Sequence, residues 1–194
     1  MNIWFKTDIN LEPRGRTGIN KQLTQEKLIM NKKISIDLLN QAVADELQAV
    51  HQYMYWHFHL DDQGFGPLSL LLKRIAIEEM GHVEHLAERI LFLKGDVEMV
   101  AAAPVEKITD AQKILAKAAA MEQAGVASYN QAAIKCGQNA DAMSKQLFES
   151  LVGDEERHFN QFDKQLDNIK RFGPNYLALQ SFEKASEKSE AGAE

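Results

Sequence analysis

The pattern Glu-x-x-His occurs twice in this chain, at 79–82 and at 155–158, each time within a long stretch whose apolar residues recur with helical period. Positions i and i+3 share one face of a helix, so each copy can present a carboxylate and an imidazole to one point. Two other long helical stretches each carry a glutamate among apolar neighbours, Glu46 and Glu122. The sequence therefore predicts four helices that direct acidic and imidazole side chains toward a common centre.

Buried carboxylates limit what such a centre can be, because each is costly unless it is paired or bound to a metal. One glutamate from each of two helices, with a Glu-x-x-His from each of the other two, is the ligand set of a di-iron site in a four-helix bundle. The six expected ligands are Glu46, Glu79, His82, Glu122, Glu155 and His158. In this arrangement Glu79 and Glu155 bridge the two irons, and each histidine binds one. Oxygen-rich ligation stabilises ferric iron, so a ferroxidase is predicted.

Composition supports an all-α protein with one domain. The 194 residues include four prolines and eleven glycines, and 45% of them are hydrophobic. A net charge of −6 argues against nucleic acid as a partner, because the phosphate backbone attracts clustered Lys and Arg. A run of some 18 apolar residues, which a membrane span requires, does not occur. The single cysteine, Cys136, allows no internal disulfide, and a cytoplasmic location is expected.

Helical periodicity and its interruptions predict the boundaries of the helices. The four long helices are expected at 35–62, 67–94, 109–135 and 140–171, with a short fifth at 175–182. Ser35 is expected to cap the first helix and Gly95 to end the second. The connection that contains Pro104 is too long for a tight turn, so it should cross over along the bundle.

The remaining segments lie outside this domain, which we expect to span 30–182. Residues 1–29 are interrupted by Pro13, Gly15 and Gly18 and are predicted to form an irregular extension. This segment is either a natural extension or the product of a start upstream of Met30. It lacks the apolar core of a secretory signal. Residues 183–194 are predicted to form a polar tail.

Two tyrosines and four further histidines complete the candidates. Tyr53 follows Glu46 by seven residues, and Tyr129 follows Glu122 by seven, so each lies nearly in line with its glutamate. Either phenol could hydrogen-bond behind the ligands or carry an electron, and the alternative for Tyr129 is a core aromatic. The other four histidines lack partner spacing and are expected at the surface or an interface; they are His51, His57, His59 and His85.

Residues 31–180 resemble the bacterioferritin family. The resemblance rests on ELQAVHQY at 46–53, IEEMGHVEHLAERILFLKG at 77–95, MEQAGV at 121–126, GDEERH at 153–158 and NYLALQS at 175–181. It implies a ferritin-like four-helix bundle with a long crossover between helices two and three and a short fifth helix. It also implies a cage of 24 identical subunits, built from dimers, that oxidises Fe(II) with O2 or H2O2 and stores ferric mineral. The six expected ligands match the family's ferroxidase ligands.

The same resemblance implies a second cofactor. Bacterioferritins hold a haem b or related porphyrin between two subunits, ligated by a methionine from each, and Met80 stands at that position. Because Met80 follows Glu79 directly, it should point about 100° away from the inward-facing ligand. The alternative is a methionine that only packs. A ferredoxin-type reductant is a further expected partner, since stored iron must be reduced for release.

The chain departs from the family pattern at two positions, and other readings stay open. Gln161 stands where many bacterioferritins carry tryptophan, and Arg74 stands where some carry a histidine that binds iron on the inner surface. One alternative is a smaller Dps-like shell that protects against peroxide. Another is a non-storing di-iron peroxidase of the rubrerythrin type. A bundle without metal would leave four inward carboxylates unexplained.

Overall fold

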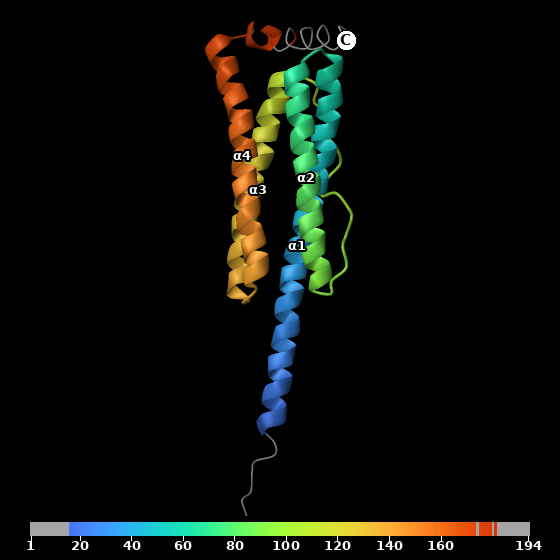
Figure 1. The fold of residues 1–194 in the computed structure, drawn as a ribbon, viewed down its shortest axis with the longest axis vertical. Helices are drawn as coiled ribbons and strands as arrows, with labels where there is room; N and C mark the ends of the chain where they lie inside the picture. Colours follow the sequence, from blue (N-terminus) through green and yellow to red (C-terminus); the bar gives the residue numbers. More distant parts are fainter. Residues whose placement is uncertain (1–15, 174, 180, 182–194) are drawn as a thin grey trace, which may run out of the picture.

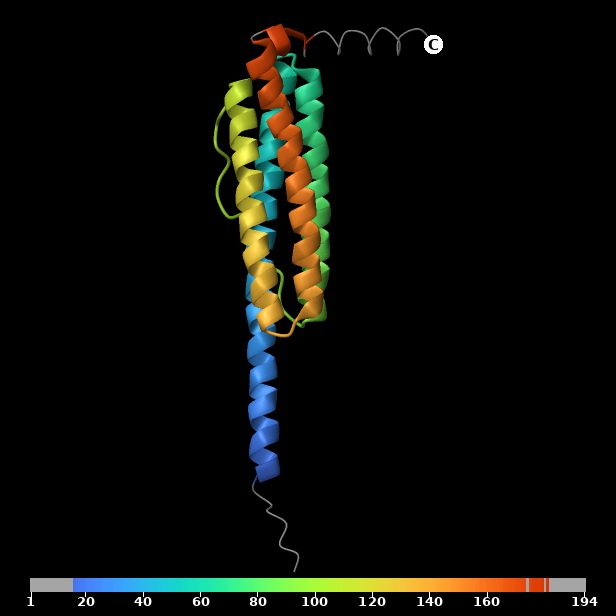
Figure 2. The same ribbon diagram turned by 90° about the vertical axis from the view of Figure 1, so that its left-hand side faces the viewer.

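The computed structural model describes residues 16–173, 175–179 and 181. Its long helices are α1 (Arg16–Asp62), α2 (Gly66–Phe92), α3 (Ala111–Gln138) and α4 (Ala142–Phe172). Helix α1 lies alongside α2 and α3 alongside α4, and the two pairs together form the bundle (Figures 1 and 2). Residues 175–179 and 181 are also helical and lie at the end of the bundle. The prediction of a ferritin-like four-helix bundle with a short fifth helix is confirmed.

Side-chain caps and a proline set three of the helix starts. The carboxylate of Asp110 accepts a hydrogen bond from the backbone N–H of Lys113 at 2.8 Å, and Asp141 caps α4 through Ser144 in the same way. Pro67 lies in the first turn of α2, where its missing N–H costs nothing. Within the described residues, none of the helices combines the length and apolar content that crossing a membrane requires.

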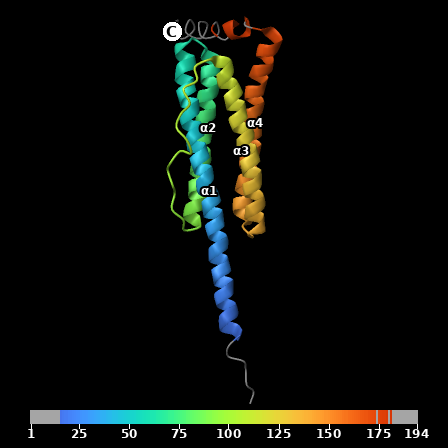
Figure 3. The same ribbon diagram turned by 180° about the vertical axis from the view of Figure 1, so that it is seen from behind.

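The start of α1 differs from the prediction. The helix begins at Arg16 rather than at Ser35, so the expected irregular extension is wrong for residues 16–29. Residues 16–34 contain no proline and only Gly18, which falls in the first turn, so nothing in this stretch breaks a helix. Ser35 is completely buried inside the helix instead of capping it. The first part of α1 projects beyond the bundle (Figures 1 and 3), while residues 1–15 and the predicted tail at 183–194 lie outside the described residues.

The end of α2 also differs in detail. The residue with the left-handed backbone conformation is Lys94, at a φ of 68°, and not Gly95. Gly95 is needed for close packing instead, because a Cβ there would lie 2.8 Å from Cγ2 of Ile36 on α1. The glycine therefore marks a close approach of the connection to α1.

The connection between α2 and α3 crosses over along the bundle beside α1, as predicted (Figure 3). Two amide side chains of α1 hold it. Gln52 donates from Nε2 to the carbonyl oxygen of Glu106 at 3.0 Å and accepts from the N–H of Glu106 at 2.7 Å. Asn40 donates to the carbonyl oxygen of Asp96 at 2.9 Å and accepts from the N–H of Glu98 at 3.0 Å. These bonds satisfy backbone groups that no helix partner satisfies.

The apolar core consists of two clusters, one toward each end of the bundle. Each helix passes from one cluster to the other. Helix α1 goes from Val43 in one to Tyr53 in the other, and α4 goes from Leu151 to Phe162. The predicted ligands occupy the stretch between the clusters on every helix. The fold therefore places its ionisable residues at mid-bundle, sealed above and below by apolar side chains.

The hydrogen bonds between Gln52 and the connection from α2 to α3 generate a stability prediction. Gln52 is 1% exposed, so Gln52→Ala removes two hydrogen bonds and leaves the N–H of Glu106 without its partner, while the carbonyl oxygen of Glu106 still accepts from the N–H of Ile108. We expect the free energy of unfolding to fall by about 2 kcal/mol. The matched control is Gln41→Ala, because Gln41 is exposed and bonds only the side chain of Asp45, and we expect a change within about 0.5 kcal/mol. Urea unfolding at one protein concentration measures the stability of both variants. Equal unfolding midpoints for Gln52→Ala and Gln41→Ala would contradict a stabilising role for the hydrogen bonds of Gln52.

Candidate metal centre

All six predicted ligand side chains meet at the centre of the bundle. Each residue is at most 6% exposed. Their ligand atoms form two groups in which every atom lies within 4.8 Å of the others. One group is Glu46, Glu79, His82 and Glu155, and the other is Glu79, Glu122, Glu155 and His158. Glu79 and Glu155 belong to both groups, so two neighbouring positions share two carboxylates.

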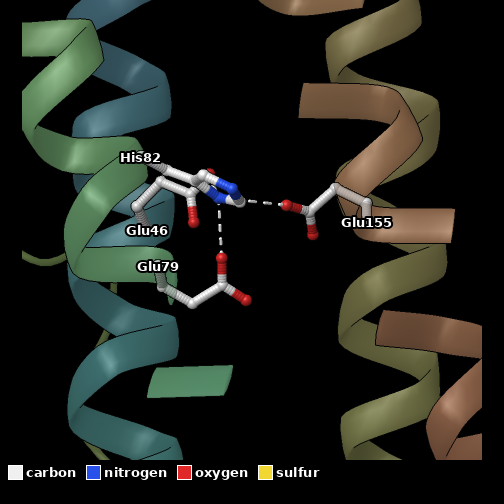
Figure 4. A group of neighbouring side chains, drawn as sticks. All are labelled: Glu46, Glu79, His82 and Glu155. Carbon is white, nitrogen blue, oxygen red and sulfur yellow. Dashed lines mark ion pairs between the residues drawn. The ribbon is translucent and has the colours of Figure 1, made fainter. Parts of the chain in front are cut away.

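His82 directs one ring nitrogen into this centre. Its Nδ1 lies 2.8 Å from Oε2 of Glu79, 3.3 Å from Oε1 of Glu46 and 3.6 Å from Oε1 of Glu155. Figure 4 shows the imidazole between carboxylates that arrive from opposite sides, with Glu46 and Glu79 on one helix pair and Glu155 on the other. Three carboxylates from three helices thus converge on one nitrogen.

His158 occupies the equivalent place on the other side of Glu79. Its Nδ1 lies 3.1 Å from Oε1 of Glu79 and 3.6 Å from Oε2 of Glu122. The rings of His158 and His82 stack with their centroids 6.0 Å apart. Glu79 therefore offers one oxygen to each imidazole, which is the placement expected of a carboxylate that bridges two cations.

Several buried polar atoms at this centre approach one another closely but form no hydrogen bond of regular geometry with any residue that the structure describes. They are both carboxylate oxygens of Glu79, Oε2 of Glu122, Oε1 of Glu155, and Nδ1 of His82 and His158. Buried polar groups are rarely left unpaired, because the cost is about 1–3 kcal/mol each. These atoms face one another in a group of carboxylates and imidazoles, and this donor set fits a pair of hard cations.

Burial and mutual repulsion move the pKa values of these residues. Burial raises the pKa of Glu46 to about 8, despite its contact with His82. Burial also raises the pKa of Glu155, and the charge of Glu79 adds to this effect. The pKa of Glu79 falls to about 2, because its contacts with His158 and His82 outweigh burial. Burial opposes the charged form of both histidines, but the adjacent carboxylates raise the pKa of each to about 10. Without a cation, protons therefore neutralise much of the cluster.

Two buried tyrosines connect the helix pairs behind the carboxylates. The hydroxyl of Tyr53 on α1 donates to Glu122 on α3, and the hydroxyl of Tyr129 on α3 donates to Oε1 of Glu46 on α1 at 2.8 Å. Burial raises the pKa of both phenols, and the neighbouring carboxylates raise it further. Both tyrosines stay protonated and orient a carboxylate from the opposite pair, so the predicted hydrogen bonds behind the ligands are present.

Sequence reasoning missed two outer carboxylates. The outward nitrogen of His158, Nε2, lies 2.8 Å from Oε2 of Glu78, and Nε2 of His82 lies 3.5 Å from Oδ2 of Asp154. A carboxylate at this nitrogen fixes the ring so that Nδ1 faces the centre. The signal was present in the sequence, because an acidic residue directly precedes each Glu-x-x-His.

The residues that α1 and α2 contribute to the centre and those that α3 and α4 contribute are related by one constant difference in residue number. The offset of 76 residues between the two Glu-x-x-His copies also separates Glu46 from Glu122, Tyr53 from Tyr129, and Glu78 from Asp154. The first half of each match lies on the pair α1 and α2, and the second half on α3 and α4. The two helix pairs therefore contribute equivalent sets of residues. This repeated offset is a stronger sequence signal than the Glu-x-x-His pattern alone.

A cavity of about 280 Å³ leads to the centre between α1 and α3. Its inner lining includes Glu46, Glu122 and Glu155. Its lining also includes Ala124 and Ser128, which are exposed, so the cavity reaches the surface. The acidic lining favours small cations over anions.

Gly125 is a second feature that the sequence analysis missed. It lies on α3, one turn after Glu122, and a Cβ there would meet Oε2 of Glu155 at 2.8 Å. The glycine leaves the space that the Glu155 carboxylate fills. A glycine inside a helix gives no sign in the sequence of what approaches it, so only the structure identifies this role.

Met80 lies apart from the cluster, on the outside of α2. It is 50% exposed, as is expected for a residue turned about 100° from Glu79. Ile77, one turn earlier, is 54% exposed. This side of α2 therefore presents apolar side chains at the surface, where they are available to a partner.

One histidine differs from its predicted surface position. His57 is buried, and its Nδ1 lies 2.7 Å from the hydroxyl oxygen of Ser69 and 3.1 Å from the carbonyl oxygen of that residue. His51 and His85 are exposed and His59 is half-buried, in agreement with the prediction. The apolar periodicity of the sequence could not show that His57 is buried and the other three are not, because the group that His57 hydrogen-bonds is Ser69 on another helix.

Known proteins resemble this chain in both sequence and structure. The family model of the ferritin-like domain matches residues 36–172. A bacterioferritin of Desulfovibrio desulfuricans is 36% identical over 143 residues, which cover 74% of this chain and 80% of that protein. A crystal structure of the Desulfovibrio desulfuricans protein, which describes its di-iron site in different catalytic states, matches with a TM-score of 0.77 and 34% identity over 79% of this chain and 90% of that one.

A second solved structure agrees. The bacterioferritin of Rhodobacter capsulatus, solved with a metal-free dinuclear site and a haem iron, matches with a TM-score of 0.73. Its identity to this chain is 32%, and the match covers 76% of this chain and 92% of that one. The family assignment therefore rests on 80–92% of the length of these relatives.

The space beside Gly125 generates a prediction about metal binding. We expect Gly125→Ala to weaken Co(II) binding by about 10-fold or more, because the new methyl group displaces the Glu155 carboxylate. Stability should not fall, since alanine favours a helix over glycine by about 1 kcal/mol. Gly153→Ala is the control, because a Cβ at Gly153 meets nothing within 4 Å. Calorimetric titration with Co(II) measures the effect, and equal affinities in the two variants would contradict it.

Proposed function

This chain belongs to the bacterioferritin family, and we propose that it oxidises Fe(II) to Fe(III) at the buried centre and stores the ferric product as mineral inside a hollow cage. The observation that carries the proposal is the pair of overlapping ligand groups that share Glu79 and Glu155. Two substrate ions held side by side can each give one electron to O2 or H2O2. The activity would be that of a ferroxidase.

We assign the ligands by their place in the two groups. Glu79 and Glu155 would bridge, since each belongs to both groups. Glu46 and His82 would complete one iron position, and Glu122 and His158 the other. Each Fe(II) would then have one imidazole among carboxylate oxygens, a set that favours the ferric state after oxidation.

The remaining residues of the site would bind and orient. The cavity between α1 and α3 supplies a route for Fe(II), and its acidic lining would attract the cation. Tyr53 and Tyr129 hold the terminal carboxylates Glu122 and Glu46 by hydrogen bonds from the opposite helix pair. The apolar clusters above and below the centre limit the access of water.

Haem and assembly form a second part of the proposal. A half-exposed thioether on an apolar side of α2 suits the face of a porphyrin, and exposed Leu70, Ile77 and Leu91 lie on the same helix. Met80 of each of two subunits would ligate a haem b or related porphyrin at the two-fold axis of a dimer. Twelve such dimers would build a 24-subunit cage. The haem iron in the Rhodobacter capsulatus relative supports this assignment.

A location and a release partner complete the proposal. The cytoplasm is the expected location, on the basis of the family and the single cysteine. Iron would leave the cage after reduction by a ferredoxin-type partner. The ligand groups come from one chain, which argues against a Dps-like shell with iron between subunits.

Iron retention separates the storage cage from a non-storing di-iron peroxidase. After aerobic loading with excess Fe(II) and size exclusion, a cage should retain far more than about two irons per chain, because the ligand groups would hold two and the rest would be mineral. Retention of about two per chain would favour the peroxidase, and retention of none would overturn the ferroxidase assignment.

The bridging role of Glu155 generates a kinetic prediction. Glu155→Gln keeps the volume of the side chain but removes its charge and one ligand oxygen, so we expect the initial rate of Fe(II) oxidation to fall by about 100-fold or more. Glu156→Gln is the control, because Glu156 is the exposed neighbour on the same helix. Stopped-flow absorbance of Fe(III) formation measures both. An unchanged rate in Glu155→Gln would remove this residue from the site.

The haem assignment generates a second prediction. We expect Met80→Ala to lose at least about nine-tenths of its haem while the initial rate of Fe(II) oxidation stays unchanged, because the variant removes the axial ligand and leaves the bundle centre intact. Met143→Ala is the control, since Met143 is also an exposed methionine but lies on α4. Visible absorbance of the protein purified from haem-supplemented cells measures the content. Full retention by Met80→Ala would refute the assignment.

A further inference from the structure

One guanidinium lies outside the metal centre and contacts both outer carboxylates. Nη1 of Arg157 lies 2.6 Å from Oε2 of Glu78, and Nη2 of Arg157 lies 2.8 Å from Oδ1 of Asp154. Glu78 belongs to α2, whereas Arg157 and Asp154 belong to α4. The bond to Glu78 therefore joins the two helix pairs at the level of the metal centre, and the bond to Asp154 lies within α4.

The same two carboxylates contact the outward nitrogens of both histidines. Glu78 approaches Nε2 of His158 at 2.8 Å, and Asp154 approaches Nε2 of His82 at 3.5 Å. A histidine binds a metal through the nitrogen that carries no proton, so its other N–H needs an acceptor. Arg157 therefore holds the carboxylate that hydrogen-bonds His158 and also the carboxylate that lies 3.5 Å from the outward nitrogen of His82.

No other cation in the described part of the chain contacts Glu78 and Asp154 together. Arg74 approaches Glu78 only at 3.8 Å and hydrogen-bonds Gln161 at 2.5 Å instead. Arg74 and Gln161, the two residues at which the sequence analysis noted a departure from the family pattern, thus bond each other. The arginine that contacts Glu78 closely is therefore Arg157.

The fork also breaks the symmetry of the two halves. The residue 76 positions before Arg157 is Gly81, which has no side chain to offer. One arginine on α4 therefore serves both histidines, although nearly every other part of the centre is present twice. A single substitution can consequently disturb both metal positions.

We propose that Arg157 is a positioning residue of the metal centre, which orients His82 and His158 through Asp154 and Glu78. This inference rests on the proposed function, because it needs both histidines to be ligands. Arg157 is half-exposed, so each of its ion pairs alone adds little stability. Its effect comes from the fixed geometry of the fork, which holds two acceptors at once.

The direction in which metal affinity changes when Arg157 is replaced distinguishes a positioning role from a purely electrostatic one. A positive charge repels a divalent cation, so removal of Arg157 would strengthen metal binding if only its charge mattered. Loss of orientation has the opposite effect, because substitution of a residue that holds a ligand typically weakens metal binding by about 10–100-fold. The two accounts therefore predict changes in opposite directions.

The test uses Co(II) titrations of the full-length, assembled protein and of three variants. We expect the unmodified protein to bind about two Co(II) per chain. Arg157→Ala should bind them about 10–100-fold more weakly, with an altered Co(II) d–d absorption at saturation. Arg157→Lys keeps the charge but cannot bond both carboxylates in the same geometry, so it should also bind more weakly, by at least about 3-fold. Arg171→Ala removes an exposed charge at the end of α4, away from the centre, and should bind like the unmodified protein.

Each outcome decides one question. Equal or tighter Co(II) binding by Arg157→Ala, with an unchanged d–d spectrum, would overturn the positioning role and leave the proposed function intact. If Arg157→Ala does not assemble, Arg157→Lys decides, and affinity equal to that of the unmodified protein would overturn the role. Failure of the unmodified protein to bind two Co(II) would instead contradict the proposed function.

Discussion

The burial of four carboxylates at mid-bundle is the constraint on which the rest of the structure depends. An uncompensated buried charge costs several kcal/mol, and a domain is stable by only about 5–15 kcal/mol in total. Four such groups could therefore unfold the chain without compensation. Protons on Glu46, Glu155 and the two histidines supply it in the metal-free protein, and cations would supply it in the metal-bound protein. The centre is stable only because opposite charges are available within a few ångströms.

This constraint also explains how the helices are arranged. Apolar side chains of all four helices pack together in the two end clusters, whereas ionisable side chains separate the two helix pairs at mid-bundle. Contacts across that separation are polar. Tyr53 and Tyr129 each bond a glutamate of the opposite pair, and Arg157 joins α4 to α2. The outer contacts thus hold the two pairs in register while the centre remains free to accept cations.

Much of the fold and of the centre could be predicted from the sequence, because both depend on periodicity. Spacing of three residues places Glu79 and His82 on one face, and the apolar period predicts the four long helices. The predictions failed where the position of a residue depends on a contact with a residue distant in the sequence. The buried position of His57 depends on a serine of α2, and the place of Gly95 depends on Ile36 of α1. The start of α1 was missed because its breaking residues fall in the first turn or before the helix.

The sequence by itself determined the helices, the ligand types and the equivalence of the two halves, because these follow from local spacing and from one repeated offset. Only the tertiary structure decided which atoms face the centre and what holds them there. The space beside Gly125 and the fork of Arg157 arise from residues on different helices, whose approach no local pattern encodes. Local periodicity sets the face of a helix on which a residue lies, and packing between helices decides what that residue meets.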